Sequence, residues 1–135
     1  MAEFPTLRVP LALAAHFDWE IHHMDVKTAF LYPELKETVY MTLPEGCGEF
    51  LPDHKPIPKM LKLLKCLYGL KQASFEWDNH IYEFLYSAGF TRSHQDHNLY
   101  MSADSIGLLY VDNSLIFGLS LSAMTALKKS LSAKY

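Results

Sequence analysis

The sequence has little of several features that would narrow its class. It contains only two cysteines, Cys47 and Cys66, so a disulfide framework is not expected. No apolar run approaches the roughly 20 residues that cross a bilayer. Residues 1–20 also lack the uninterrupted apolar core of a secretory signal peptide. We therefore expect an intracellular, cytoplasmic protein with no membrane partner.

Positive charge is not in excess either. The twelve lysines and arginines are outnumbered by fifteen aspartates and glutamates, which gives a formal charge of -3. No global field therefore attracts nucleic acid. Apolar material is plentiful, because 50% of the residues are hydrophobic and 13% are aromatic. We expect one domain, residues 1–135, with a buried core.

Apolar spacing and end signals predict three helices. One follows Pro10 and covers about 10–17, and a second covers 73–88 with Gly89 closing it. The third lies at the end of the chain, where apolar residues recur at helical spacing.

Strands are predicted from alternation and from β-branched and aromatic residues. In the first, which runs into Asp25, alternate side chains point to opposite faces. The other predicted strands are 37–43, 98–101 and two hairpin arms, 106–111 and 114–119. Residues 44–58, rich in proline, are expected to form a loop. Helices interleaved with strands indicate an α+β fold in which helices cover one face of a mainly antiparallel sheet.

The stretch "LLYVDNSLIFG" sets Asp112-Asn113 between two apolar runs. Asp and Asn both tolerate the backbone angles of a tight two-residue loop, so the pattern predicts a hairpin turn. A second interpretation pairs Asp112 with Asp25, at the end of the earlier strand. Two carboxylates at adjacent strand ends form a minimal Mg²⁺ cradle. Residue spacing alone leaves both interpretations open.

Several longer blocks occur in a fixed order: "LALAAHFDWEIHHMDVKTAFL", "VYMTLPEG", "LYGLKQAS", "GFTRSHQDHNLY" and "LLYVDN". Together they resemble the reverse transcriptase domain of copia-type LTR retrotransposons, over about Leu11 to Tyr135. The resemblance implies a polymerase palm, an antiparallel sheet with helices packed on one face. It also implies that the fingers are incomplete here and that the thumb and RNase H domains lie outside the chain.

The resemblance assigns metal-binding roles residue by residue. Asp25 and Asp112 match the catalytic aspartates that bind two Mg²⁺ or Mn²⁺ ions, and Val26 would offer a backbone carbonyl to one ion. Asn113 occupies the position of a further aspartate, so it is a degenerate catalytic position.

Nucleotide-binding roles are implied in the same way. Phe30 matches the aromatic steric gate beneath the sugar, although packing in the core is an alternative role for this ring. Gln72 and Gly69 match residues that line the nucleotide site. The expected partners are an RNA or DNA template-primer, dNTP and the remaining polyprotein domains. The family also acts in virus-like particles and reaches the nucleus.

Asn113 is the main departure from the family pattern. At about 4 Å and an effective dielectric of 20, a carboxylate–cation contact is worth on the order of 4 kcal/mol. Losing one such charge predicts weak or absent activity. Phe75, where an arginine is usual, also removes a cation from the template side. Two functions stay open: an impaired RNA-directed DNA polymerase fragment, or a catalytically inactive remnant or co-opted binding module.

Two other clusters suggest alternative chemistry. The adjacent His22 and His23 point to opposite faces of a strand, so they cannot chelate one ion together. His94 and His97 would need two further ligands for a zinc site. The lysines form a modest cluster that is either a solvated face or a phosphate-contacting strip; they are Lys59, Lys62, Lys65 and Lys71.

Overall fold

The computed structural model describes residues 4–47, 58–118 and 120–135. Within these residues the fold is α+β, with a five-stranded antiparallel sheet in the order β1-β7-β6-β5-β4 and a separate pair, β2-β3. The strands are β1 (Glu20–Asp25), β2 (Tyr40–Thr42), β3 (Met60–Lys62), β4 (Thr91–Arg92), β5 (Leu99–Met101), β6 (Ser105–Tyr110) and β7 (Asn113–Gly118). The helices are α1 (Phe4–Phe17), α2 (Ala73–Ser87) and α3 (Leu121–Lys134), with a short 3₁₀ helix, η1 (Ala29–Leu31).

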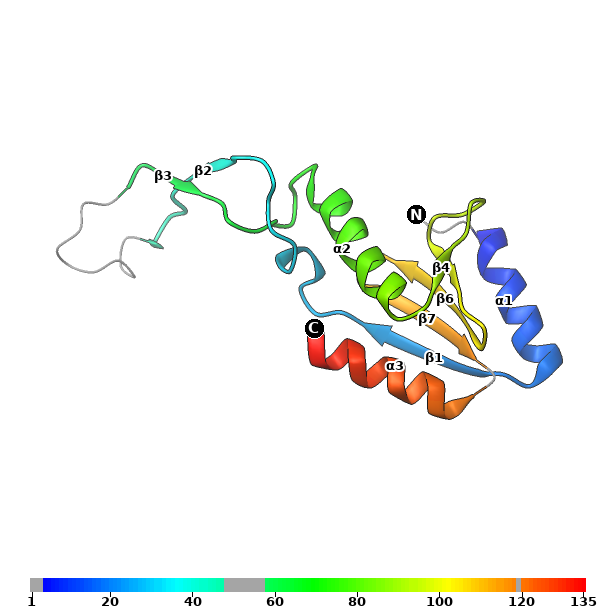
Figure 1. The fold of residues 1–135 in the computed structure, drawn as a ribbon. Helices are drawn as coiled ribbons and strands as arrows, with labels where there is room; N and C mark the ends of the chain where they lie inside the picture. Colours follow the sequence, from blue (N-terminus) through cyan, green and yellow to red (C-terminus); the bar gives the residue numbers. More distant parts are fainter. Residues whose placement is uncertain (1–3, 48–57, 119) are drawn as a thin grey trace.

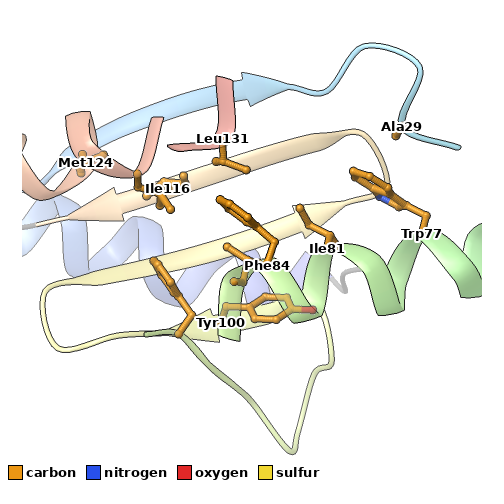
Figure 2. Close-up of a cluster of buried hydrophobic side chains, with 11 residues drawn as sticks. Ala29, Trp77, Ile81, Phe84, Tyr100, Ile116, Met124 and Leu131 are labelled. Atoms are coloured by element: carbon orange, nitrogen blue, oxygen red, sulfur yellow. The ribbon is translucent and has the colours of Figure 1, made fainter. Parts of the chain in front are cut away.

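The helices cover both faces of the larger sheet, so the prediction that they pack on one face is wrong. Ile116 of β7 belongs to the core formed with α2 and α3, which Figure 2 shows. Its neighbour Phe117 belongs to a second cluster with Ala14 of α1. Successive strand residues point to opposite faces, so α1 packs on the side away from α2 and α3. Apolar residues at both odd and even positions of β7 require this second cover.

Helix α2 matches its prediction closely. It spans Ala73–Ser87, with Trp77, Ile81, Phe84 and Leu85 buried on one face. Gly89 has φ of 88°, a backbone angle that suits glycine, and its amide donates to the Tyr86 carbonyl. The Phe90 amide donates to the Leu85 carbonyl, which completes a Schellman cap. The prediction for α3 is also confirmed, because Met124, Leu127 and Leu131 are its buried residues.

Helix α1 begins six residues earlier than predicted. It starts at Phe4, and Pro10 lies inside the helix with its side chain fully buried. Pro5, in the first turn, occupies the kind of position where a missing N–H has no effect. Pro10 has no N–H to bond within this helix, and its ring is buried. No helix in the described ranges is long and apolar enough to span a membrane.

The hairpin is confirmed, but its turn is displaced by one residue. The loop consists of Val111 and Asp112, because Tyr110 pairs with Asn113 across the strands. Asn113 is therefore the first residue of β7 and not the second residue of the turn. Leu119, at the end of the predicted second arm, lies outside the described residues.

Strands β2 and β3 form an arm that extends away from the larger sheet (Figure 1). The predicted strand 37–43 is shortened to Tyr40–Thr42, which pairs with Met60–Lys62. Of the predicted loop 44–58, residues 48–57 lie outside the described residues. A bridge between Glu34 and Lys65 continues the pairing toward the body of the protein.

Candidate functional site

The pairing of β1 with β7 brings the two predicted aspartates to one end of the sheet. Asp25 ends β1 and is the direct cross-strand partner of Asn113. One residue further, the Val26 amide donates to the Asp112 carbonyl at 2.8 Å. Pair types alternate in an antiparallel ladder, so Asp25 and Asn113 form a non-hydrogen-bonded pair, with Cα atoms about 4.5 Å apart. Their side chains therefore project side by side from one face.

The turn next to this pair is strained, and a side chain of α2 holds it in place. Val111 has φ of 55°, which a β-branched residue rarely adopts. The indole Nε1 of Trp77 donates to the Val111 carbonyl at 2.7 Å, and the Trp77 side chain is buried at the turn end of the hairpin (Figure 2). Helix α2 thus fixes the carbonyl that directly precedes Asp112. The apolar spacing that predicts α2 gives no sign of this contact between the helix and the turn.

Both ends of the Asn113 amide have hydrogen-bond partners. Its Oδ1 lies 2.9 Å from Nε2 of His23, and its Nδ2 lies 3.4 Å from Oδ1 of Asp112. His23 lies two residues before Asp25, on the same exposed face of β1. The sequence alone does not predict this contact for His23. The contact with Asn113 depends on cross-strand register, which no local pattern reveals.

The two aspartates differ in their surroundings. Asp25 is exposed, whereas Asp112 is half-buried. A cavity of about 450 Å³ borders Asp25 along the free edge of β1, and Lys27 of the following loop and Lys128 of α3 also line it. Negative and positive side chains therefore share one solvent-accessible hollow at this edge.

The donor set can be compared with what a divalent cation requires. Among the residues that the structure describes, no three His, Cys, Asp or Glu side chains gather as a metal site. The strand end offers two carboxylates, from Asp25 and Asp112. Mg²⁺ is commonly held by one or two carboxylates together with substrate phosphates and water, so this set fits one such ion. It fits a second ion less well, because the Asn113 oxygen is directed to His23.

The predicted nucleotide-binding residues lie around the base of α2. Phe30, half-buried in η1, packs its ring against Tyr68 at a centroid distance of 4.8 Å. Gly69 has φ of 93° and open space where a Cβ would project, so backbone conformation is the reason for glycine here. Gln72 directs its Nε2 to a Glu37 oxygen at 2.9 Å. Their roles in nucleotide binding stay predictions.

A second cavity, of about 310 Å³, connects this region to the turn. Phe30 and Val111 both line it, together with Phe75, whose side chain is 65% exposed. Phe75 therefore places an uncharged ring at the surface where the family pattern has an arginine. The four lysines of the predicted basic cluster are all exposed, as either interpretation of them requires.

Comparisons with known proteins agree on one family. Residues 1–135 match the family described as "Reverse transcriptase (RNA-dependent DNA polymerase)". The chain is 36% identical to the "Retrovirus-related Pol polyprotein from transposon TNT 1-94" of Nicotiana tabacum, and the match covers 100% of the chain. It is 38% identical over 84% of its length to the corresponding polyprotein from transposon RE1 of Arabidopsis thaliana.

A shorter relative is the putative transposon Ty5-1 protein of Saccharomyces cerevisiae, which is 35% identical over 83% of the chain. The matched segment is 10% of the tobacco polyprotein, 8% of the Arabidopsis polyprotein and 36% of the yeast protein. The chain therefore corresponds to a small part of its longer relatives. No solved structure gives a significant match to the chain.

Proposed function

Because this chain belongs to the reverse transcriptase (RNA-dependent DNA polymerase) family of retrotransposon Pol polyproteins, we propose that it is a polymerase palm whose nucleotidyl-transfer site is weakened at Asn113. The observation that carries the proposal is the convergence of Asp25 and Asp112 from distant parts of the chain. The Val26 amide, which donates to the Asp112 carbonyl at 2.8 Å, fixes the two strand ends together. Such a pair at strand ends is suited to holding Mg²⁺ against phosphate oxygens.

In this proposal the chain's own residues hold and orient the reactants. Asp25 and Asp112 supply carboxylates, and Val26 supplies a backbone carbonyl. A bound divalent cation would neutralise charge on the transferred phosphoryl group. Phe30 limits the space beneath the sugar, and its packing on Tyr68 gives that ring a fixed position. Gln72 and Gly69 border the nucleotide on the side of α2.

Asn113 is expected to lower catalysis through charge and not through fold. An amide keeps the start of β7 intact, since Asn113 pairs with Tyr110 and with Asp25 in the ladder. It contributes no negative charge to a site that gathers divalent cations. A shortfall of 1.4 kcal/mol in transition-state stabilisation is about a tenfold loss of rate. We propose that the chain retains weak activity at most.

The template-primer and the rest of the polymerase are proposed partners. The exposed lysines Lys59, Lys62, Lys65 and Lys71 suit contact with phosphates. The fingers, thumb and RNase H domains would come from sequence outside the matched segment.

A second candidate is a catalytically inactive remnant or a binding module. The observation that favours it is the amide of Asn113, which bonds to His23 and Asp112 and so uses both its ends within the protein. With that arrangement, the polar atoms of the Asn113 side chain have hydrogen-bond partners without a bound cation.

Primer extension separates the two candidates. The chain would replace the matching segment of the tobacco polyprotein, and the chimera would be assayed on an RNA template with Mg²⁺ or Mn²⁺. We expect weak dNTP incorporation that Asp25→Ala abolishes and that Asn113→Asp raises tenfold or more, about 1.4 kcal/mol in barrier. The matched control is Asn79→Asp, the same change of charge on a half-buried residue of α2.

Two results would contradict the proposed function. If Asn113→Asp gives no incorporation while the unaltered tobacco polyprotein is active in the same assay, the inactive remnant is the better account. If Asn79→Asp raises incorporation as much as Asn113→Asp, the gain is a general effect of charge and the proposed defect at residue 113 is wrong.

A further inference from the structure

The contact between Asn113 and Asp112 determines which way the Asn113 amide faces. The Nδ2 of Asn113 lies 3.4 Å from a carboxylate oxygen of Asp112. An amide nitrogen only donates and a carboxylate only accepts, so this contact is favourable in one orientation alone. The reverse orientation would place Oδ1 against the Asp112 carboxylate, where two acceptors repel each other.

Once that orientation is set, the Asn113 oxygen points to β1. Its Oδ1 lies 2.9 Å from Nε2 of His23, a normal hydrogen-bond length. Because Oδ1 can only accept, Nε2 of His23 must carry the proton. His23 and Asn113 are diagonal neighbours across β1 and β7, since the direct partner of Asn113 is Asp25. The contact therefore spans the strand pair that carries both aspartates.

We propose that His23 is a positioning residue that holds the Asn113 oxygen away from the cation position between Asp25 and Asp112. This inference rests on the proposed function, because it concerns the same site. In this arrangement residue 113 bridges His23 and Asp112 by hydrogen bonds and contributes no ligand. The loss of a charge at position 113 is thus accompanied by the loss of a neutral oxygen.

Removal of the His23 donor should release that oxygen. The Asn113 backbone is fixed by its pairing with Asp25 and Tyr110, so the side chain can turn without a change in the strands. The freed amide can then present Oδ1 to a cation bound by the two carboxylates. Cation affinity should rise when His23 loses its donor, whereas a residue that merely supports the strand would lower affinity when removed.

Mn²⁺ binding to the 135-residue chain tests this, measured by electron paramagnetic resonance and by calorimetry. We expect His23→Leu to tighten Mn²⁺ binding about threefold to tenfold, the range of one hydrogen-bond-sized interaction. His23→Gln keeps an N–H donor and should change affinity by less than about twofold. His22→Leu is the matched control on the opposite face of β1 and should leave affinity unchanged.

A double variant shows whether the gain passes through Asn113. In the Asn113→Ala background there is no amide oxygen to release, so His23→Leu should add nothing. An equal gain in both backgrounds, or an unchanged or lower affinity in His23→Leu alone, overturns the positioning role. The absence of any Mn²⁺ binding that depends on Asp25 would instead overturn the proposed function, and the two failures are distinguishable.

A metal-free measurement tests the hydrogen bond itself. Long-range ¹⁵N–¹H correlation spectra of the neutral imidazole should show the Nε2–H tautomer for His23. Asn113→Ala should change the ¹⁵N shift of His23 and leave that of His22 as it was. A predominant Nδ1–H tautomer of His23 in the unaltered chain contradicts the inference, whatever the binding results.

Discussion

The β6–β7 hairpin and the β2–β3 arm are both two-stranded antiparallel ribbons, but they differ in what supports them. The hairpin lies between two layers, and its Ile116 and Phe117 are buried on opposite faces. In the arm, Tyr40 and Met60 are 56% and 57% exposed, and no described residue of either strand is buried. A ribbon without a packed face is marginal in water.

This difference explains how the hairpin can hold a strained turn. A positive φ at a β-branched residue costs of order 1–3 kcal/mol and persists only where the surroundings enforce it. Val111 meets that condition, because Trp77 holds its carbonyl and the core holds Trp77. The arm has weaker ties to the body through Gln72–Glu37 and through Lys36–Glu76 at 3.5 Å. The candidate site thus lies where the fold can enforce geometry.

Truncation of Trp77 should remove the support of the hairpin turn. We expect it to have the largest effect on the free energy of unfolding. Trp77→Ala deletes a buried ring, 3% exposed, and leaves the Val111 carbonyl without its donor. We expect a loss of about 3–5 kcal/mol in the free energy of unfolding. Urea denaturation followed by far-ultraviolet circular dichroism measures it.

Trp77→Phe separates packing from the hydrogen bond. It keeps a ring and removes only the N–H, so we expect a smaller loss, about 1–3 kcal/mol. Weaker Mn²⁺ binding should accompany that loss, because Asp112 follows the carbonyl that is set free. If Mn²⁺ affinity is unchanged in Trp77→Phe, the indole does not hold the site.

The sequence predicts much of the support for this site. The spacing of apolar residues locates α2 and α3, and Gly89 marks the end of α2 correctly. The turn is displaced by one residue because Asp112-Asn113 and Val111-Asp112 are both compatible with the local apolar pattern. The structure places Val111 in the turn, where its carbonyl accepts a hydrogen bond from the Trp77 indole of a distant helix.

The candidate site also has features that the sequence implies and features that only the tertiary structure reveals. The convergence of Asp25 and Asp112 is implied by family resemblance, and the strand pairing brings them together. The His23–Asn113 bond and the position of α1 on the second face depend on tertiary register. Residue types alone carry no information about either.

Tyr100, in β5 of the larger sheet, should have an effect of intermediate size on the free energy of unfolding. Its ring is 1% exposed, and its hydroxyl has no hydrogen-bond partner among the described residues. Burial raises the pKa of the Tyr100 phenol to about 12, against the opposing charge of Arg92. The folded state therefore keeps the proton longer than the unfolded chain does. Stability should be fully present below pH 10 and fall as the pH rises toward 12, by about 1.4 kcal/mol per pH unit.

Tyr100→Phe should abolish that part of the alkaline loss. At neutral pH it removes an unpartnered hydroxyl, so we expect unchanged stability or a gain of up to about 1 kcal/mol. Tyr40→Phe, the same change in the exposed arm, should alter neither quantity. Urea titrations at neutral and alkaline pH measure both variants. A substantial loss of stability in Tyr100→Phe at neutral pH would show that the hydroxyl has a partner after all.

The smallest effect is expected in the arm, where one leucine can be compared with its counterpart in the core. Leu127→Ala in α3, at a position 8% exposed, should cost about 2–5 kcal/mol. Leu61→Ala in β3 removes the same atoms from a half-buried position and should cost less than about 0.5 kcal/mol. The amides of residues 40–42 and 60–62 should also exchange with solvent faster than those of 113–118, because the arm can open locally. Equal losses for the two leucines would mean that the arm unfolds with the body, and that its few polar ties transmit more stability than their exposure suggests.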